Sequence, residues 1–322
     1  SDTHFDFIII GGGSAGYAAA RTAHGEGLRV AVVDGAAELG GLCILRGCMP
    51  SKTLIESADR AHTIRHAAEF GLKAQSSGVD LTVIRDRKRA LIADFAGYRE
   101  GQLMDGRFVL YRGHAAFVDA HTLEILPRDG SASFQVTARS FCLTTGSVAS
   151  VPPIAGLAET GFWTSDDILD AAELPQRFAV LGGGAIALEM AHYLEAMGRQ
   201  VTLIQRSAQF LTGTDPECSA VIEKAYTQRG ITCHLGTQIQ QVSQHETGKR
   251  LDYLHGGEAR QLDVDEILLA MGRVPATDGL QLDAAGVSLD GKKIQVQPTM
   301  QTTQPHIFAA GDVCSPLDVV HI

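Results

Sequence analysis

Two glycine-rich segments with the same pattern, 171 positions apart, constrain the fold of this 322-residue chain more than any other feature. Residues 5–34 read FDFIIIGGGSAGYAAARTAHGEGLRVAVVD, and residues 176–205 read QRFAVLGGGAIALEMAHYLEAMGRQVTLIQ. Each predicts an apolar strand, a glycine turn, a helix and a second strand, which together make a βαβ unit. Because such units form parallel sheets with right-handed crossovers, we expect an α/β fold. The repeat predicts two Rossmann-like doubly wound domains, the second inserted in the first. Residues 262–271 and 307–312 are each expected to form one further apolar strand.

The first glycine segment has the residues that a dinucleotide site needs. Gly11 permits the tight turn, Gly13 lets the backbone approach a pyrophosphate, and Gly16 lets the helix pack closely on the strand. The pyrophosphate would sit at the helix N-terminus, where free N–H groups favour an anion. Asp34 ends the second strand, where an acid can bind the ribose hydroxyls of an adenosine.

The second glycine segment differs at two positions that matter chemically. Ala187 stands in place of the third glycine, and Gln205 and Arg206 stand where the first segment has its acid. A carboxylate would repel a 2′-phosphate, whereas Arg206 can pair with one, so the sequence favours NADPH over NADH. One acid-marked site and one without an acid suggest two cofactors, a flavin and a nicotinamide nucleotide, between which hydride can pass.

Composition excludes several other classes of function. The chain has 27 Lys and Arg against 37 Asp and Glu, a net charge of −10, which argues against a nucleic-acid surface. No apolar run approaches the roughly 18–20 residues that cross a bilayer. Six cysteines are too few for a disulfide-stapled secreted scaffold, and we expect a cytoplasmic protein without a membrane or nucleic-acid partner.

A cysteine pair lies shortly after the first segment, in GGLCILRGCMPSK (residues 40–52). Pro50 suits the first turn of a helix, which places Cys48 near a helix N-terminus, where the dipole favours a thiolate; Lys52 adds positive charge on the same face.

Cys43, Cys48, His62 and His66 also come close to a zinc spacing. However, residues 50–66 read as one helix, and about 21 Å along it separates Cys48 from His62, so we predict no metal site.

The cysteine segment resembles the redox-disulfide motif of the flavin-dependent pyridine nucleotide–disulfide oxidoreductases, which include dihydrolipoamide dehydrogenase, glutathione reductase and mercuric reductase. Three further segments follow in the family's order: TTG at 144–146, LAMGRVPATDGL at 269–280 and HIFAAGDV at 306–313. The resemblance implies that Cys43 meets the external substrate and that Cys48 stacks on the flavin. It also implies that Lys52 lies by the flavin and pairs with Glu189, and that Asp312 binds the ribityl chain.

The resemblance assigns two sets of cofactor-binding residues. The FAD set is Gly11, Gly13, Ser14, Ala15, Gly16, Asp34, Gly41, Leu42, Lys52, Thr145, Gly146, Gly311 and Asp312. The NAD(P)H set is Gly182, Gly184, Ala185, Ile186, Glu189, Gln205, Arg206 and Gly272.

The resemblance also predicts the domain organisation. The FAD-binding domain would comprise residues 1–150 and return over 273–322, with the NAD(P)H-binding domain over 151–272 between them. The family's C-terminal interface domain, which carries its dimer contact and a His–Glu acid/base pair, is expected to be absent. The full-length parent is expected to be a homodimer.

Several activities stay open at this point. The implied reaction takes electrons from NAD(P)H through FAD to a Cys43–Cys48 disulfide and on to a small disulfide or dithiol substrate, as in a dihydrolipoamide dehydrogenase. The alternatives are a mercuric or glutathione reductase. From another class, the chain could be an electron-transfer or redox-sensing module without full turnover.

Overall fold

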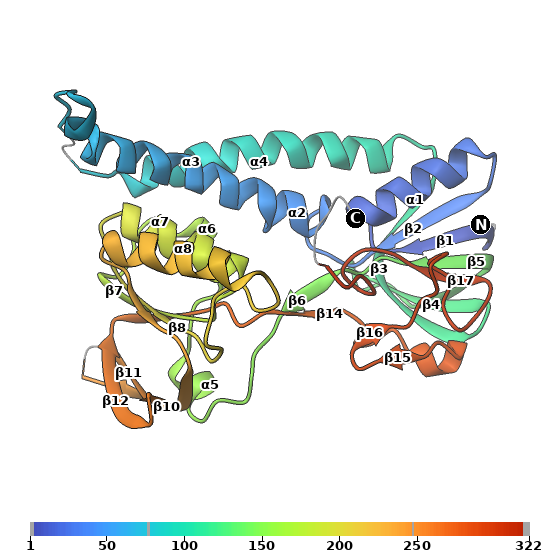
Figure 1. The fold of residues 1–322 in the computed structure, drawn as a ribbon. Coiled ribbons are helices and arrows are strands. Elements are labelled where there is room, and N and C mark those ends of the chain that lie inside the picture. The colour runs from blue at the N-terminus through green and yellow to red at the C-terminus, as the bar shows by residue number, and fades with distance from the viewer. Residues whose placement is uncertain (1–2, 76–77, 247, 318–322) are drawn as a thin grey trace. The chain divides into compact units, whose positions relative to one another are not determined.

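The computed structural model describes residues 3–75, 78–246 and 248–317, which form two compact units (Figure 1). Unit 1 comprises residues 1–49, 91–148 and 273–322, and unit 2 comprises residues 50–90 and 149–272. The α/β fold class predicted from the two βαβ segments is confirmed, because each unit contains a parallel sheet with a glycine turn at its centre.

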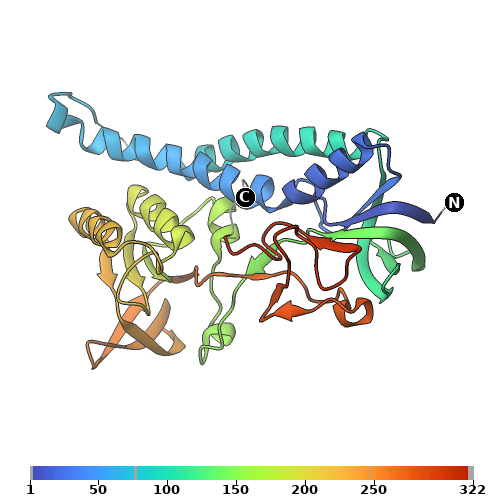
Figure 2. The ribbon, with the colours of Figure 1, turned by 45° about the vertical axis from the view of Figure 1, so that its right-hand side comes forward.

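Unit 1 is built on a six-stranded sheet in which β1 lies between β2 and β5, and β17 continues the parallel part beyond β5. Its buried strands are nearly continuous apolar runs, as expected for a parallel sheet covered on both faces. Helix α1 packs along β1, β2 and β5 (Figures 1 and 2). The elements are β1 (His4–Ile10), α1 (Ser14–Gly25), β2 (Val30–Asp34), α2 (Gly41–Leu45), β3 (Val109–Asp119), β4 (Thr122–Pro127), β5 (Phe134–Leu143), η2 (Leu282–Ala285), β15 (Leu289–Asp290), β16 (Lys293–Ile294) and β17 (Ile307–Ala309).

Unit 2 repeats the βαβ arrangement and adds an antiparallel sheet. Its parallel sheet has the order β13-β7-β8-β9, and its second sheet has the order β10-β11-β12. The elements are η1 (Ala67–Phe70), α5 (Leu157–Thr160), α6 (Ser165–Asp170), β7 (Arg177–Leu181), α7 (Ala185–Ala196), β8 (Gln200–Ile204), α8 (Pro216–Gln228), β9 (Thr232–His234), β10 (Thr237–His245), β11 (Gly248–His255), β12 (Glu258–Val264) and β13 (Glu266–Leu269).

Four elements lie at the boundaries between the units. Helices α3 (Cys48–Arg65) and α4 (Leu81–Met104) each contribute to both units, and the short strands β6 (Ser147–Ala149) and β14 (Arg273–Pro275) pair with each other. Residues 50–90 group with unit 2 because Leu54, Ala58 and Leu81 pack in its core. The division into FAD-binding and nucleotide-binding domains stays a prediction.

Two strand predictions were wrong in their extent. Residues 262–271 were expected to form one strand, but the chain leaves β12 at Asp265 and enters β13. The carboxylate of Asp265 accepts hydrogen bonds from the backbone and guanidinium of Arg177, which fixes the change from the antiparallel to the parallel sheet. The late strand at 307–312 ends at Ala309, and Gly311 turns the chain with a φ of 81°.

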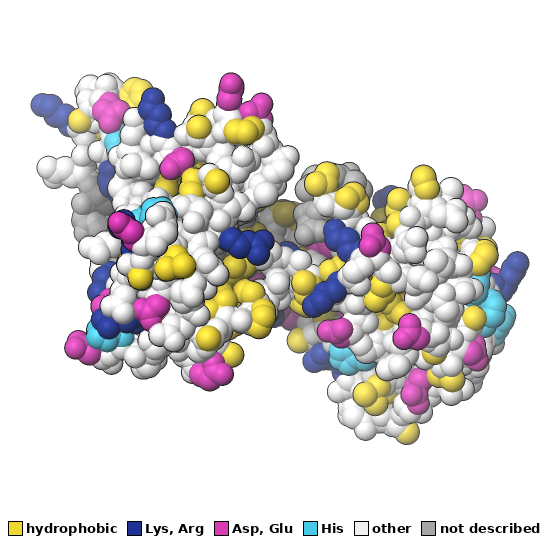
Figure 3. All heavy atoms as spheres, turned by 60° about the horizontal axis from the view of Figure 1, so that its bottom comes forward, with side chains coloured by type: hydrophobic (Ala, Val, Ile, Leu, Met, Phe, Trp, Pro, Cys, Tyr) yellow, Lys and Arg dark blue, Asp and Glu magenta, His cyan; other side chains and the backbone are white. Residues whose placement is uncertain are grey.

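Other predictions from the sequence concern surface and metal binding. No helix in the described part of the chain is long and apolar enough to cross a membrane. Within residues 3–75, 78–246 and 248–317 no group of three or more metal-ligating side chains comes together, and α3 is the continuous helix that separates Cys48 from His62. On the face shown in Figure 3, acidic, basic and apolar side chains are interspersed. The absence of nucleic-acid binding stays a prediction.

Candidate functional site

The first glycine turn brings three backbone segments of unit 1 into close approach. A Cβ on Gly11 would lie 2.4 Å from the carbonyl oxygen of Thr144, and a Cβ on Gly41 would lie 2.5 Å from the Cα of Gly13. Helix α1 starts after Gly13, and no side chain caps it. The backbone N–H groups of its first turn therefore donate no hydrogen bond to a capping side chain. A backbone cradle with free amides at a helix N-terminus fits the pyrophosphate of a dinucleotide.

Asp34 lies against this turn. It is buried, accepts a hydrogen bond of 2.7 Å from the N–H of Gly12 through Oδ2, and one of 2.8 Å from the N–H of Ala36 through Oδ1. The sequence missed Arg112, whose Nη1 lies 3.7 Å from Asp34 Oδ1 while Nη2 donates to the carbonyls of Ala36 and Ala37. No spacing connects Arg112 with the glycine motif. Each carboxylate oxygen of Asp34 retains a lone pair, so the ribose role predicted for Asp34 remains chemically open.

The second glycine turn, in unit 2, has the same backbone pattern with a more open centre. A Cβ on Gly182 would lie 2.2 Å from the carbonyl oxygen of Ala270, whereas a Cβ on Gly184 would meet no heavy atom within 4 Å. Helix α7 begins after Gly184, again without a side-chain cap. This turn therefore also fits a pyrophosphate.

The two residues that replace the acid lie in different environments. Gln205 lies against the glycine turn, where a Cβ on Gly183 would be 2.8 Å from the Gln205 side chain, and its Nε2 donates to the carbonyl of Gln209. Arg206 is exposed and forms no ion pair with any residue in the described ranges. Its guanidinium can therefore receive an anionic ligand.

The structure brings the two predicted redox cysteines together as free thiols. Cys43 lies on α2, Cys48 is the first residue of α3, and Cys43 forms hydrogen bonds with both the side chain and the backbone of Cys48. Burial, together with the neighbouring Cys48 and a smaller contribution from Asp312, raises the pKa of the Cys43 thiol to about 11. Cys48 is exposed, so the two sulfurs differ in access to solvent.

Lys52 and Glu189, both in unit 2, form the ion pair that the resemblance implied. Lys52 Nζ lies 2.6 Å from Glu189 Oε1, and their side chains are 57% and 31% exposed. Lys52 comes one turn after Cys48 on α3, and Glu189 lies on the second turn of α7. The role of the pair stays a prediction.

The Asp312 carboxylate of unit 1 is held through Ser147 and Arg273, two residues that the sequence did not single out. Ser147 Oγ donates to Asp312 Oδ2 at 2.7 Å and accepts from Arg273 Nε at 2.8 Å. Thr145 Oγ1 donates to the carbonyl of Ala276 at 2.7 Å. Arg273 follows Gly272 in a segment matched to the family, but only the three-dimensional structure shows its contact with Ser147.

The remaining predicted cofactor residues lie at the two turns or in the loops beside them. Their side chains are small or partly exposed; Gly146, Gly272 and Gly311 adopt positive φ where the backbone bends sharply, whereas Gly16 lies within α1. They are Ser14, Ala15, Gly16, Leu42, Gly146 and Gly311 in unit 1, and Ala185, Ile186 and Gly272 in unit 2.

Comparison with known proteins gives the class to which this site belongs. The family model described as "Pyridine nucleotide-disulphide oxidoreductase" matches residues 5–322. The chain therefore belongs to the pyridine nucleotide–disulfide oxidoreductase family, whose members use FAD and NAD(P)H.

Two curated proteins and one solved structure are among those similar to this chain. A mercuric reductase of Bacillus cereus is 33% identical over 99% of this chain and 50% of its own length. A dihydrolipoyl dehydrogenase of Thermus scotoductus is 34% identical over 98% of this chain and 68% of its own length. The solved structure of the Cu(II) complex of the HOCl-induced flavoprotein disulfide reductase RclA from Escherichia coli aligns with a TM-score of 0.87 at 28% identity, over 99% of this chain and 68% of that one. The chain thus spans about half the length of the curated mercuric reductases it matches.

Proposed function

We propose that this chain is the cofactor-binding and redox part of an FAD-dependent disulfide oxidoreductase that uses NADPH and acts on a small disulfide or dithiol, as dihydrolipoamide dehydrogenases do. The observation that carries the proposal is the Cys43–Cys48 pair, hydrogen-bonded at the start of α3 within electrostatic range of Asp312. Bound FAD would supply a two-electron acceptor for hydride and a two-electron donor to the cysteine disulfide.

The residues of unit 1 would hold the flavin nucleotide. The first glycine turn would bind its pyrophosphate, Asp34 its adenosine ribose, and Asp312 its ribityl chain. The role of Asp312 is supported by its hydrogen bond from Ser147, which accepts one from Arg273 in turn, because these contacts orient the carboxylate through Oδ2.

The residues of unit 2 would hold NADPH. The turn at Gly182 and Gly184 would bind its pyrophosphate, and Arg206 would pair with its 2′-phosphate. In the same unit, the Lys52–Glu189 ion pair would lie near the reacting ring of the nucleotide, where each charged group fixes the position of the other.

The reaction of the dithiol with a substrate disulfide is balanced without any further oxidant. The Cys43 thiolate attacks one substrate sulfur, forms a mixed disulfide and releases the first substrate thiolate, which takes a proton. Cys48 then attacks Cys43 Sγ and releases the second thiol, so that the cysteine pair is oxidised and the substrate reduced. Because the pKa of Cys43 is raised to about 11, a base must remove its proton, the task that the family's His–Glu pair would perform.

The decisive experiment follows the colour of the purified chain. We expect a yellow protein that bleaches anaerobically with NADPH, and a long-wavelength charge-transfer absorbance that is lost in Cys48→Ser while FAD stays bound. A colourless protein that cannot take up FAD, or an absorbance unchanged in Cys48→Ser, would contradict the proposal.

The substrate is a second question, for which the relatives named mercuric reductase favour Hg(II) as an alternative to a disulfide. Assaying lipoamide, glutathione disulfide and Hg(II) side by side would rank them. Flavin reduction by NADPH without turnover of any of these would favour an electron-transfer or sensing module. A homodimeric full-length protein and a cytoplasmic location are part of the same proposal.

A further inference from the structure

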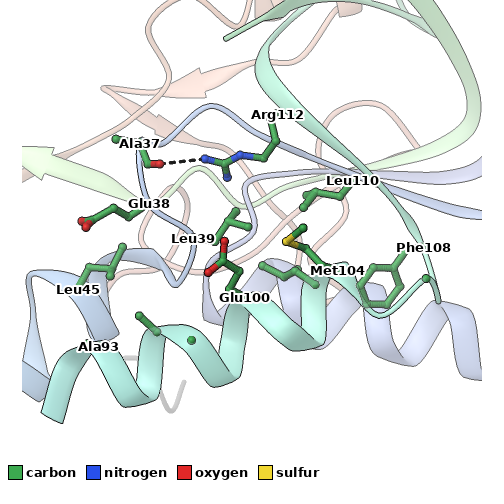
Figure 4. Close-up of a pocket in the computed structure, with 14 residues that line it drawn as sticks. Ala37, Glu38, Leu39, Leu45, Ala93, Glu100, Met104, Phe108, Leu110 and Arg112 are labelled. Atoms are coloured by element: carbon green, nitrogen blue, oxygen red, sulfur yellow. Dashed lines mark hydrogen bonds between the residues drawn. The ribbon is translucent and has the colours of Figure 1, made fainter. Parts of the chain in front are cut away.

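A cavity in unit 1 adjoins the first glycine turn, although no residue of that turn lines it. Its volume is about 670 Å³, within the roughly 300–1,000 Å³ of sites that bind small organic molecules. Helix α4, the start of β3, α2 and the loop after β2 form its walls (Figure 4). Most of the lining is apolar and includes Leu39, Leu45, Ala96, Leu103, Phe108 and Leu110.

Only three charged side chains line the cavity, and their charges do not cancel. Arg112 is paired with Asp34 rather than with the glutamates: Nη2 donates to the carbonyls of Ala36 (2.6 Å) and Ala37 (3.1 Å), and the buried Nη1 lies 3.7 Å from Asp34 without a hydrogen-bond partner among the described residues. Glu38 and Glu100 are exposed, and neither forms an ion pair with a residue that the structure describes. In Figure 4 the Glu100 side chain extends from α4 toward the loop of Leu39. The cavity thus combines an apolar interior with two uncompensated carboxylates.

We propose that this cavity binds a small lipophilic organic cation. The apolar walls favour a ligand with hydrocarbon or aromatic surface, and the two carboxylates favour a positive over a negative charge. A neutral apolar ligand would gain nothing from Glu38 and Glu100, and an anion would be repelled by both. Because Leu45 belongs to α2, the helix that carries Cys43, the ligand would contact the segment that holds the redox thiol.

Tetraphenylphosphonium and tetraphenylborate test the proposal because they have the same shape and opposite charge. Isothermal titration of the full chain is expected to show one tetraphenylphosphonium bound per chain, at least tenfold more tightly than tetraphenylborate. Glu100→Gln and Glu38→Gln are each expected to weaken the cation about two- to fivefold, the range of an exposed charge pair. Equal binding of the two ions, or no binding of the cation, would overturn the proposal.

Two glycines of α4 provide a matched pair of variants. Gly97 lines the cavity and Gly101 does not, and a Cβ on either would meet no heavy atom within 4 Å. Gly97→Leu should fill the cavity and reduce cation binding at least tenfold, while Gly101→Leu should leave it unchanged. Unchanged binding in Gly97→Leu would overturn the assignment. Self-association of the chain that Gly97→Leu abolishes in sedimentation would instead assign the cavity to a second copy and would also overturn it.

Discussion

Gly184 allows the nucleotide role of the second turn to be tested apart from its structural role. The residue precedes α7 with φ −83° and ψ −178°, a conformation that alanine adopts freely, and a Cβ there would meet no protein atom within 4 Å. Gly182, two residues earlier, has a φ of 122°, and a Cβ on it would lie 2.2 Å from the carbonyl oxygen of Ala270. Substitution by alanine should therefore affect mainly nucleotide binding at Gly184 and mainly the stability of unit 2 at Gly182.

The magnitudes follow from these geometries. For Gly184→Ala, replacing a glycine at the helix N-cap by alanine lowers the free energy of unfolding by about 0.5–1 kcal/mol. The smaller conformational entropy of the unfolded chain raises the free energy of unfolding by about 0.4–1 kcal/mol. The free energy of unfolding should change by less than about 1 kcal/mol. If a pyrophosphate approaches this backbone, the added methyl group must displace it, and NADPH binding should weaken at least about tenfold, or about 1.4 kcal/mol. Gly182→Ala should instead destabilise unit 2, because backbone must move to relieve the contact.

Urea unfolding and titration of NADPH measure the two effects separately. Gly101→Ala on α4 is the control, because it adds a methyl group in open space and lies far in sequence from both turns. It should stabilise the helix by up to about 1 kcal/mol and leave NADPH binding unchanged. If Gly184→Ala binds NADPH as tightly as the unaltered chain, the pyrophosphate does not lie on this turn and the reasoning is refuted.

Three further predictions concern charged and titratable groups. At pH 8 only about 0.1% of Cys43 would be thiolate at a pKa of about 11. Burial is the main cause of this raised pKa, and the electrostatic interaction and side-chain hydrogen bond with Cys48 add to it. Cys48→Ser should therefore lower the pKa of Cys43 and speed its alkylation by iodoacetamide, and an unchanged pH–rate profile would contradict this. A double-mutant cycle on Lys52→Met and Glu189→Gln should give a coupling in urea unfolding of at most about 1 kcal/mol, because both side chains are partly exposed, and more than about 2 kcal/mol would show a buried interaction. Burial raises the pKa of Asp170, but hydrogen bonds from Lys88 and Arg89 outweigh it and lower the pKa below its usual value. This ion pair should stabilise the fold above the unfolded pKa and lose its contribution as pH falls through the folded one. Unfolding titrations from pH 6 to 3 should therefore show a flatter profile for Asp170→Asn than for the unaltered chain, and equal slopes would count against it.

Local patterns were sufficient to predict the two βαβ units. The strand, turn and helix of each glycine segment depend on apolar runs and on glycines within about 30 residues, and the structure has β1, α1 and β2, and β7, α7 and β8, where the patterns indicate them. The helix after Cys48 was equally predictable, since residues 50–66 contain no glycine and no internal proline. In both cases nearest-neighbour chemistry decides the structure.

Contacts between distant segments could not be predicted. The Ser147–Asp312 hydrogen bond joins residues 165 positions apart, and the Arg112–Asp34 contact joins β3 to the end of β2, its parallel neighbour. The break at Asp265 was missed for the same reason, because an apolar run does not reveal that its two halves pair with different sheets. Sheet register, which determines each of these contacts, depends on the whole unit.

The difference between the two turns gives the physical basis for two different cofactors in one chain. In the first turn the carboxylate of Asp34 accepts the N–H of Gly12, which places a negative charge beside the cradle and disfavours a phosphate on the adjacent ribose. In the second turn the neutral amide of Gln205 lies against Gly183, and the neighbouring Arg206 has no carboxylate partner among the described residues. A 2′-phosphate is thus disfavoured at one turn and compatible with the other. If the second turn prefers NADPH over NADH as proposed, Gln205→Glu should reduce that preference, and an unchanged preference would place the 2′-phosphate elsewhere.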